Sequence, residues 1–305
     1  MRPSRPTAAA LAAALATGFP AALALALLAA AGCAPARNPG DWVSVREVTP
    51  AFLVGQVALH PALAADPYGR VALTWVTRDT SGMDCWLSIS RDSGVSFAAP
   101  VRVNARPGGV TSMAEARPMP VFGPDARLAV VWCERREGNE AAVDVVARTS
   151  GDGGATLGTP TVVNDDAGET RPIYHGFPSL AFLPDGALFA VWMDERELRP
   201  VERAEGEEPA ASLFYALSHD GGQSWSDNRS LTDRACPCCR AAAVTDAEGR
   251  IAVAYRSAAN DLRDPALAVS ENGGHTFDFD TLISADGWRL PGCPVVAMNA
   301  SCLES

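Results

Sequence analysis

Short apolar runs separated by turns recur along the chain from about residue 57 onwards. One set of runs carries an aromatic residue near its end, at Trp75, Trp132, Trp192 and Tyr255. A second set follows the first after a short turn, at residues 86–89, 143–147, 213–217 and 266–269. Short apolar runs bounded by turns are typical of β-strands. The pattern therefore predicts a chain built almost entirely from short strands.

Four turns carry the same motif, Ser-x-Asp/Asn-x-Gly-x-Ser/Thr followed by an aromatic residue or Leu. The four segments read SRDSGVSF, SGDGGATL, SHDGGQSW and SENGGHTF. Asp or Asn can hydrogen-bond its own turn backbone, Gly takes a positive φ, and the closing apolar residue packs beneath the turn. We therefore expect a structural role in hairpin turns for Ser90, Asp92, Gly94, Ser150, Asp152, Gly154, Ser218, Asp220, Gly222, Trp225, Ser270, Asn272 and Gly274.

A third set of strands opens further upstream in each unit and is expected to be innermost. These strands begin at His60-Pro61, Arg117-Pro118, Phe177-Pro178, Arg240-Ala241 and Cys293-Pro294. Each complete unit then holds four strands, and units that recur at roughly 60-residue intervals are typical of propeller blades. A β-sandwich also has many short strands but lacks such recurrence. The predicted fold is an all-β propeller over residues 57–305, with four blades and part of a fifth.

The repeated turns resemble the Asp boxes of the sialidase (neuraminidase) superfamily, and the resemblance covers residues 60–288. It implies a six-bladed propeller in the complete family, so this chain is expected to stop short of a closed ring at its C-terminus. It also implies a glycan-directed protein, an exo-α-sialidase-like glycoside hydrolase if the chain is active. Because a fold does not fix a function, a non-catalytic propeller that binds glycan or protein is the alternative.

The resemblance further implies a site at the mouth of the central channel, where the innermost strands begin. Sialidases hold the substrate carboxylate with three arginines, attack with a tyrosine that a glutamate assists, and use an aspartate for the leaving-group proton. A guanidinium suits the first role because its planar fork matches a carboxylate. The residues expected in these roles are Arg117, Arg171, Arg240, Tyr174, Glu134 and Asp194. From the residues alone, the arginines could equally line the channel, and the acids could form ion pairs between blades.

Cysteines gather just before the fourth innermost strand, in the run Cys236-Pro237-Cys238-Cys239, and Cys293 stands at the equivalent place one unit later. Because neighbouring innermost strands run side by side, these thiols are expected to meet. They could form disulfides that link adjacent blades in an oxidising compartment. As thiolates they could instead hold copper or zinc, or carry redox chemistry.

Two histidines, His60 and His175, also lie near innermost-strand starts. Two histidines without a third ligand make a weak metal signal, and hydrogen-bonded polar histidines are the preferred interpretation. No cofactor and no histidine metal site is expected.

The first 32 residues are expected to form a signal peptide, because Arg2 and Arg5 precede an Ala/Leu-rich run that ends in small residues. Cleavage before Cys33 would leave a cysteine for lipid attachment, with residues 33–56 as a linker or strand. A net charge of −11 makes nucleic acid an unfavourable partner. We therefore expect an exported monomer of the cell envelope that is held at the membrane only by its lipid.

Overall fold

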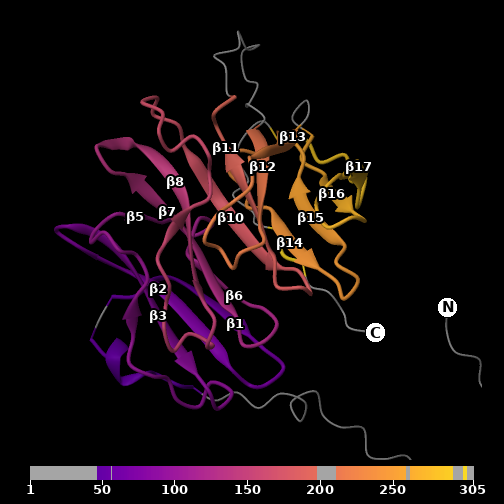
Figure 1. Cartoon of the computed structure of the whole chain (residues 1–305). Coiled ribbons are helices and arrows are strands. Elements are labelled where there is room, and N and C mark those ends of the chain that lie inside the picture. Colours follow the sequence, from indigo (N-terminus) through magenta and orange to yellow (C-terminus); the bar gives the residue numbers. More distant parts are fainter. Residues whose placement is uncertain (1–46, 56, 198–210, 259–261, 291–297, 301–305) are drawn as a thin grey trace, which may run out of the picture. The chain divides into compact units, whose positions relative to one another are not determined.

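The computed structural model describes residues 47–55, 57–197, 211–258, 262–290 and 298–300. The chain divides into two units, Met1–Glu47 and Val48–Ser305. Every described strand belongs to the second unit (Figure 1). The predicted signal peptide, the lipid-attachment residue Cys33 and the cysteine Cys293 lie outside the described residues.

The second unit consists almost entirely of antiparallel strands, arranged in four successive sheets. The first sheet holds β1 (Leu59–Ala65), β2 (Val71–Asp79), β3 (Gly82–Ser90) and β4 (Val101–Arg102). The second holds β5 (Val110–Thr111), β6 (Met119–Phe122), β7 (Leu128–Arg136), β8 (Asn139–Ser150) and β9 (Thr161–Val162). The third holds β10 (His175–Phe182), β11 (Leu188–Asp194), β12 (Ala211–Ser218) and β13 (Arg229–Ala235). The fourth holds β14 (Ala242–Thr245), β15 (Ile251–Arg256), β16 (Pro265–Ser270) and β17 (Asp278–Leu282), and a 3-10 helix, η3 (Ala51–Leu53), precedes the first sheet.

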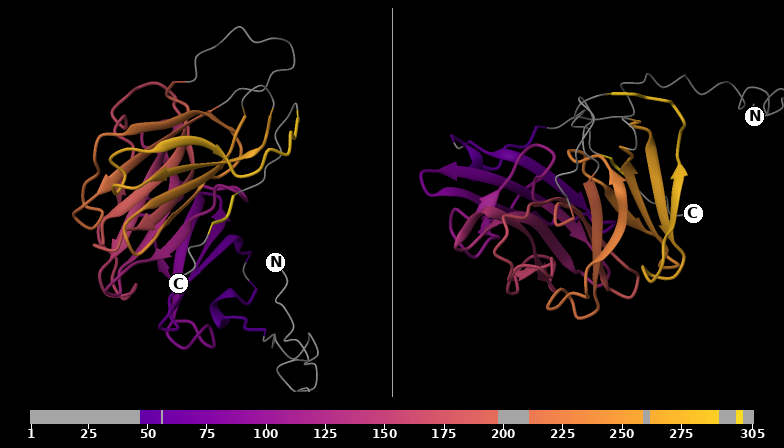
Figure 2. Two further views of the ribbon diagram at one scale, coloured as in Figure 1. Left: turned by 90° about the vertical axis from the view of Figure 1, so that its right-hand side faces the viewer. Right: turned by 90° about the horizontal axis from the view of Figure 1, so that it is seen from above.

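The innermost strands lie side by side, β1 against β6, β6 against β10, and β10 against β14. Hydrogen bonds join neighbouring sheets there: Thr74 Oγ1 donates to the Pro118 carbonyl (2.9 Å), and the Ala243 amide donates to Ser179 Oγ (3.2 Å). Figure 2 shows the sheets following one another with their faces opposed. This is the arrangement of successive blades in a β-propeller. Among the described strands, no ladder joins the first sheet to the fourth, so no closed ring is seen.

Apolar side chains fill the spaces between adjacent blades. Leu87 on β3 and Trp132 on β7 share the cluster between the first two sheets. Phe189, Tyr215 and Phe277 pack in tilted and edge-on pairs between the third and fourth sheets, with ring centroids 5.1–5.8 Å apart. Strand β11 is buried at every position because its sheet is covered on both faces, whereas β16 alternates between buried and partly buried residues. Continuous burial of this kind explains why the middle strands read as unbroken apolar runs.

The four repeated turns share one hydrogen-bond pattern, which explains their recurring residue types. In the second turn, Ser150 Oγ donates to Asp152 Oδ1 (2.7 Å) and accepts the amide of Gly154 (2.8 Å). The carboxylate of Asp152 also accepts the amide and hydroxyl of Thr156 (2.9 and 2.6 Å). The same contacts recur around Asp92, Asp220 and Asn272. The serine and the Asp or Asn side chain of each turn therefore accept hydrogen bonds from the backbone amides of that turn.

The strands predicted from the apolar runs are present, with one difference in the second sheet. There the innermost strand is split, because both β5 and β6 pair with β7. Residues 112–118 leave the ladder between them and carry Arg117. No helix within the described residues is long and apolar enough to span a membrane.

Candidate functional site

Two of the predicted arginines lie where innermost strands begin. Arg117 precedes β6 and Arg240 precedes β14, each by two residues. The guanidinium of Arg240 reaches across β10: its Nη1 donates to the Met119 Sδ (3.3 Å) and its Nη2 to the Asn299 Oδ1 (3.4 Å). Arg240 is only 3% exposed. Among the described residues, this buried guanidinium thus has only a thioether and a long amide contact as side-chain partners.

Positive charge is concentrated around this point. Among the described residues, no ion pair joins a carboxylate to Arg117 or Arg240. Burial lowers the pKa of Arg240, the nearby charge of Arg117 lowers it further, and only Glu115 opposes them. The pKa of His60 is lowered by burial and then by the charges of Arg78 and Arg117. These groups therefore share one cationic region at the innermost strands.

A small cavity of about 140 Å³ opens beside Arg240. Its walls come from β6, β10 and β14, including Met119, Ser179 and Ala242, and from residues 298–300. One charged group and a few polar ones on an otherwise apolar wall is the usual composition of a ligand pocket.

Arg171 does not join the other two arginines. Its side chain is 57% exposed and pairs with Glu169 (2.7 Å), and its Nη1 donates to the Arg196 carbonyl (3.3 Å). Such an exposed pair contributes little to stability.

Tyr174 packs against the apolar cluster that also contains Ala116 and Ala241, the neighbours of the two arginines. Burial is the main cause that raises the pKa of Tyr174, and Cys133 and Glu195 raise it further. The amide of Glu195 donates to the Tyr174 carbonyl (3.1 Å). Burial also raises the pKa of Glu195. The backbones of Tyr174 and Glu195 are thus hydrogen-bonded, and Glu195 rather than Asp194 is the acid that acts electrostatically on Tyr174.

Asp194 belongs instead to a buried polar network around His175. His175 Nε2 lies 3.1 Å from Asp166 Oδ2, and its Nδ1 lies 3.0 Å from Asp194 Oδ2, at an angle unsuited to a hydrogen bond. Asp194 also accepts Trp192 Nε1 (2.8 Å) and pairs with Arg196 (2.9 Å). Both His175 and Asp194 are fully buried. Such contacts fix the third blade against the second and leave Asp194 no exposed oxygen.

Glu134 occupies the corresponding place in the second blade. It accepts Trp132 Nε1 (2.9 Å) and lies 3.6 Å from Arg106 Nε. Burial raises the pKa of Glu134 against the opposing effects of Trp132 and Arg106. The second histidine, His60, contacts the Ser112 hydroxyl through Nδ1 (2.9 Å).

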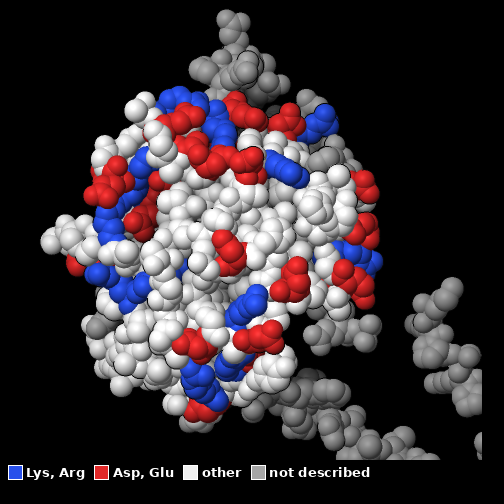
Figure 3. Space-filling model, viewed as in Figure 1, with Lys and Arg blue, Asp and Glu red and all other residues white. Residues whose placement is uncertain are grey.

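Acidic and basic side chains intermingle on the face shown in Figure 3, where red and blue groups alternate along the rim. No extended surface of one sign is visible on this face among the described residues.

The cysteines lie together at a turn between β13 and β14. Cys236 is a buried thiol, and Cys238 is disulfide-bonded. A hydrogen bond with Cys239 is the main cause that lowers the pKa of Cys236 to about 6, against the effect of burial, and the charges of Arg263 and Arg256 contribute. Cys85 and Cys133, in other blades, are buried thiols whose pKa values burial raises.

No protein-family model and no curated protein sequence matches this chain. Among solved structures, a protein of unknown function from Dyadobacter fermentans is similar, with a TM-score of 0.51 and 15% identity over 75% of this chain and 65% of that one. The α-L-arabinanase of Penicillium chrysogenum gives a TM-score of 0.46 and 19% identity over 72% of this chain and 63% of that one. The NanB sialidase of Streptococcus pneumoniae gives a TM-score of 0.48 and 12% identity over 83% of this chain and 56% of that one.

This chain spans less than two thirds of each of these three structures. At this level of identity, the likeness to the Dyadobacter protein shows a shared fold alone.

Proposed function

We propose that this protein is an envelope-located propeller that binds an acidic glycan at the start of its innermost strands. The observation that supports the proposal is the buried guanidinium of Arg240 beside Arg117, with no carboxylate paired to either among the described residues. The carboxylate of a sugar acid is the ligand group that this pair of cations would recognise.

The physical argument rests on the cost of burying charge. An ionised group removed from water is unfavourable unless an opposite charge and hydrogen bonds compensate it. The contacts that Arg240 makes to Met119 and Asn299 provide little compensation. A carboxylate would accept two parallel hydrogen bonds from a guanidinium and neutralise its charge, whereas a neutral sugar cannot neutralise that charge.

Calorimetric titration of the full-length protein with an N-acylated sugar acid, and with a neutral sugar of similar size, tests this proposal. We expect binding of the acid only, weakened at least tenfold in Arg240→Gln and in Arg117→Gln. Arg171→Gln is the matched control, because Arg171 is exposed and paired with Glu169. Equal binding of both sugars, or equal loss in the control, would contradict the proposal.

A second candidate function is hydrolysis of the bound glycan in the manner of an exo-α-sialidase. The hydrogen-bonded backbones of Tyr174 and Glu195 support it, since a half-buried carboxyl group with a raised pKa near a tyrosine can assist it as a nucleophile. A fluorogenic sialoside is the direct substrate. Tyr174→Phe and Glu195→Gln should remove turnover and retain binding of the sugar acid. If the wild type binds the sugar acid but does not hydrolyse the sialoside, hydrolysis is ruled out and only the binding function remains.

The envelope location rests on the N-terminal sequence. We propose that residues 1–32 are a signal peptide, that Cys33 carries the lipid, and that the exported chain is a monomer anchored by that lipid. Labelling of cells with a fatty-acid analogue should mark the wild type and not Cys33→Ser. Light scattering of the purified chain measures the oligomeric state.

A further inference from the structure

The run Cys236-Pro237-Cys238-Cys239 forms a tight turn directly after β13. The Cys239 amide donates to the Cys236 carbonyl (3.4 Å), which places Pro237 and Cys238 at the two central positions. Proline is favoured at the first central position because its ring fixes φ near the required value. The Cys236 amide donates to the Arg256 carbonyl (2.8 Å) and so ties the turn to β15. The backbone thus holds the three cysteines in place independently of any bond between their sulfurs.

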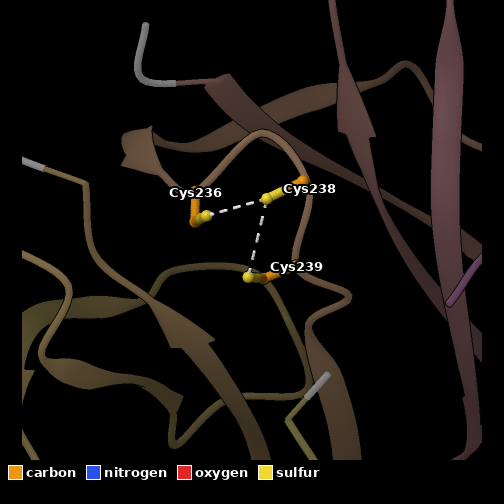
Figure 4. Close-up of side chains that lie close together, drawn as sticks. All are labelled: Cys236, Cys238 and Cys239. Atoms are coloured by element: carbon orange, nitrogen blue, oxygen red, sulfur yellow. Dashed lines mark hydrogen bonds between the residues drawn. The ribbon is translucent and has the colours of Figure 1, made fainter. Parts of the chain in front are cut away.

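All three sulfurs point toward one another across this turn (Figure 4). The Cys238 Sγ lies 3.5 Å from the Cys236 Sγ and 4.0 Å from the Cys239 Sγ, and all three lie within 4.8 Å of one another. A disulfide would need about 2.05 Å, so none of the three is bonded to another. Thiolates about 2.3 Å from one tetrahedral zinc ion stand about 3.8 Å apart. The observed separations match sulfurs arranged around a single ion.

The surroundings of the cluster suit a thiolate complex. Cys236 and Cys239 are 1% and 4% exposed, and they pack with Ala258. Both Arg256 and Arg263 act electrostatically on Cys236. The negative charge of three thiolates exceeds the positive charge of either a monovalent or a divalent ion, so a complex would be anionic. Nearby guanidinium groups would stabilise such a complex.

We propose that Cys236, Cys238 and Cys239, when reduced, bind one thiophilic cation, Cu(I) or Zn(II). Thiolate ligands select these ions over hard cations such as Mg²⁺ and Ca²⁺. The disulfide of Cys238 is the oxidised alternative. A phosphine reductant supplies two electrons, breaks that bond and gives two thiols, and the three ligands then lose their protons on binding the ion.

The test uses the full-length protein, reduced with a phosphine under inert gas. Zn(II) is titrated in competition with a chromophoric chelator, and Cu(I) in competition with a Cu(I)-selective chelator. We expect one equivalent of one of these ions per chain, with affinity at least 100-fold lower in Cys236→Ser and in Cys238→Ser. Cys85→Ala is the control, because Cys85 is a buried thiol on β3 in the first blade.

Comparison of the Zn(II) and Cu(I) titrations identifies the ion. Binding of Co(II) gives a second readout, because cobalt thiolate complexes have a charge-transfer absorption. Cys238 is only partly buried, so Cys238→Ser should remain folded by circular dichroism even where Cys236→Ser does not. The proposal fails if the reduced wild type binds neither ion. It also fails if Cys238→Ser binds as tightly as the wild type, or if reduction unfolds the chain.

Discussion

Arg240, in the loop before β14, donates from Nη1 to the Sδ of Met119 on β6, 3.3 Å away. The contact spans the width of β10, which lies between these two innermost strands. A thioether is a weak acceptor, so this bond cannot offset the removal of a guanidinium from water. This is the reason why we propose a ligand-binding role for Arg240.

Replacement of Arg240 by Met should separate stability from binding. Because Met keeps the apolar stem of Arg without its charge, we expect the unligated variant to unfold at the same temperature as the wild type or a few degrees higher. The stabilisation that a sugar acid gives the wild type should be absent from the variant. Thermal unfolding with and without the sugar acid measures both effects. A large decrease in the melting temperature of unligated Arg240→Met would show that an internal partner already compensates the charge.

The buried network around His175 should make stability depend on pH. Burial opposes protonation of His175, but the contacts with Asp166 and Asp194 outweigh it, so its pKa is raised above 6.5. A histidine whose pKa is raised by folding stabilises the folded state fully at pH values below its unfolded-state pKa. This stabilisation is lost as the pH rises through its folded-state pKa. The carboxyl groups of Asp166 and Asp194 have lowered pKa values in spite of burial, so their contribution is lost only as the pH falls well below 4.

His175→Gln should be less stable than the wild type by about 3 kcal/mol near pH 6, because it removes one of the two cations, His175 and Arg196, that lie against the buried carboxylates of Asp166 and Asp194. The difference should shrink as the pH rises through the folded pKa of His175. Urea unfolding between pH 5 and pH 9 measures it, and the exposed His219→Gln is the control. A difference that does not vary with pH would show that His175 is neutral in the folded protein.

The sequence pattern predicted the strands and turns well because both depend on local features. Apolar runs such as 188–193 and the repeated polar turns carry their structure in a few adjacent residues. Side-chain partners were harder to predict. Arg171 pairs with Glu169 in its own loop, and Asp194 points inward to His175, because strand register and loop path decide which way adjacent side chains point. The excursion at residues 112–118, which positions Arg117, left no signal in the apolar pattern.

The repeated turns should tolerate Asn in place of Asp but not Ala. In the fourth turn Asn272 Oδ1 accepts the Thr276 amide (2.9 Å) and its Nδ2 donates to the Thr276 hydroxyl (2.7 Å), which reproduces the contacts of Asp152. We therefore expect Asp152→Asn to keep the wild-type melting temperature at neutral pH and Asp152→Ala to lower it by a few degrees.

The same pair of variants gives a pH test. Hydrogen bonds from the Thr156 hydroxyl and amide are the main cause that lowers the pKa of Asp152 to about 2. The wild type should lose this stabilisation as the pH falls from about 4 toward 2. The contribution of Asn at this position should stay constant. Equal melting temperatures for Asp152→Ala and the wild type would show that the turn does not depend on this side chain.

A last prediction concerns two backbone segments in direct contact. Gly82, the first residue of β3, has a φ of +131°, and a Cβ placed there would lie 2.2 Å from the Gly108 carbonyl oxygen. Gly94 has a similarly positive φ of +83° but open space around it. Ala at Gly94 should therefore cost only the strain of the left-handed backbone, about 1 kcal/mol. Ala at Gly82 adds a clash with backbone that cannot rotate away, so we expect a loss of about 3 kcal/mol or more. Chemical denaturation of the two variants measures the difference, and equal losses would show that the loop at Gly108 moves aside without cost.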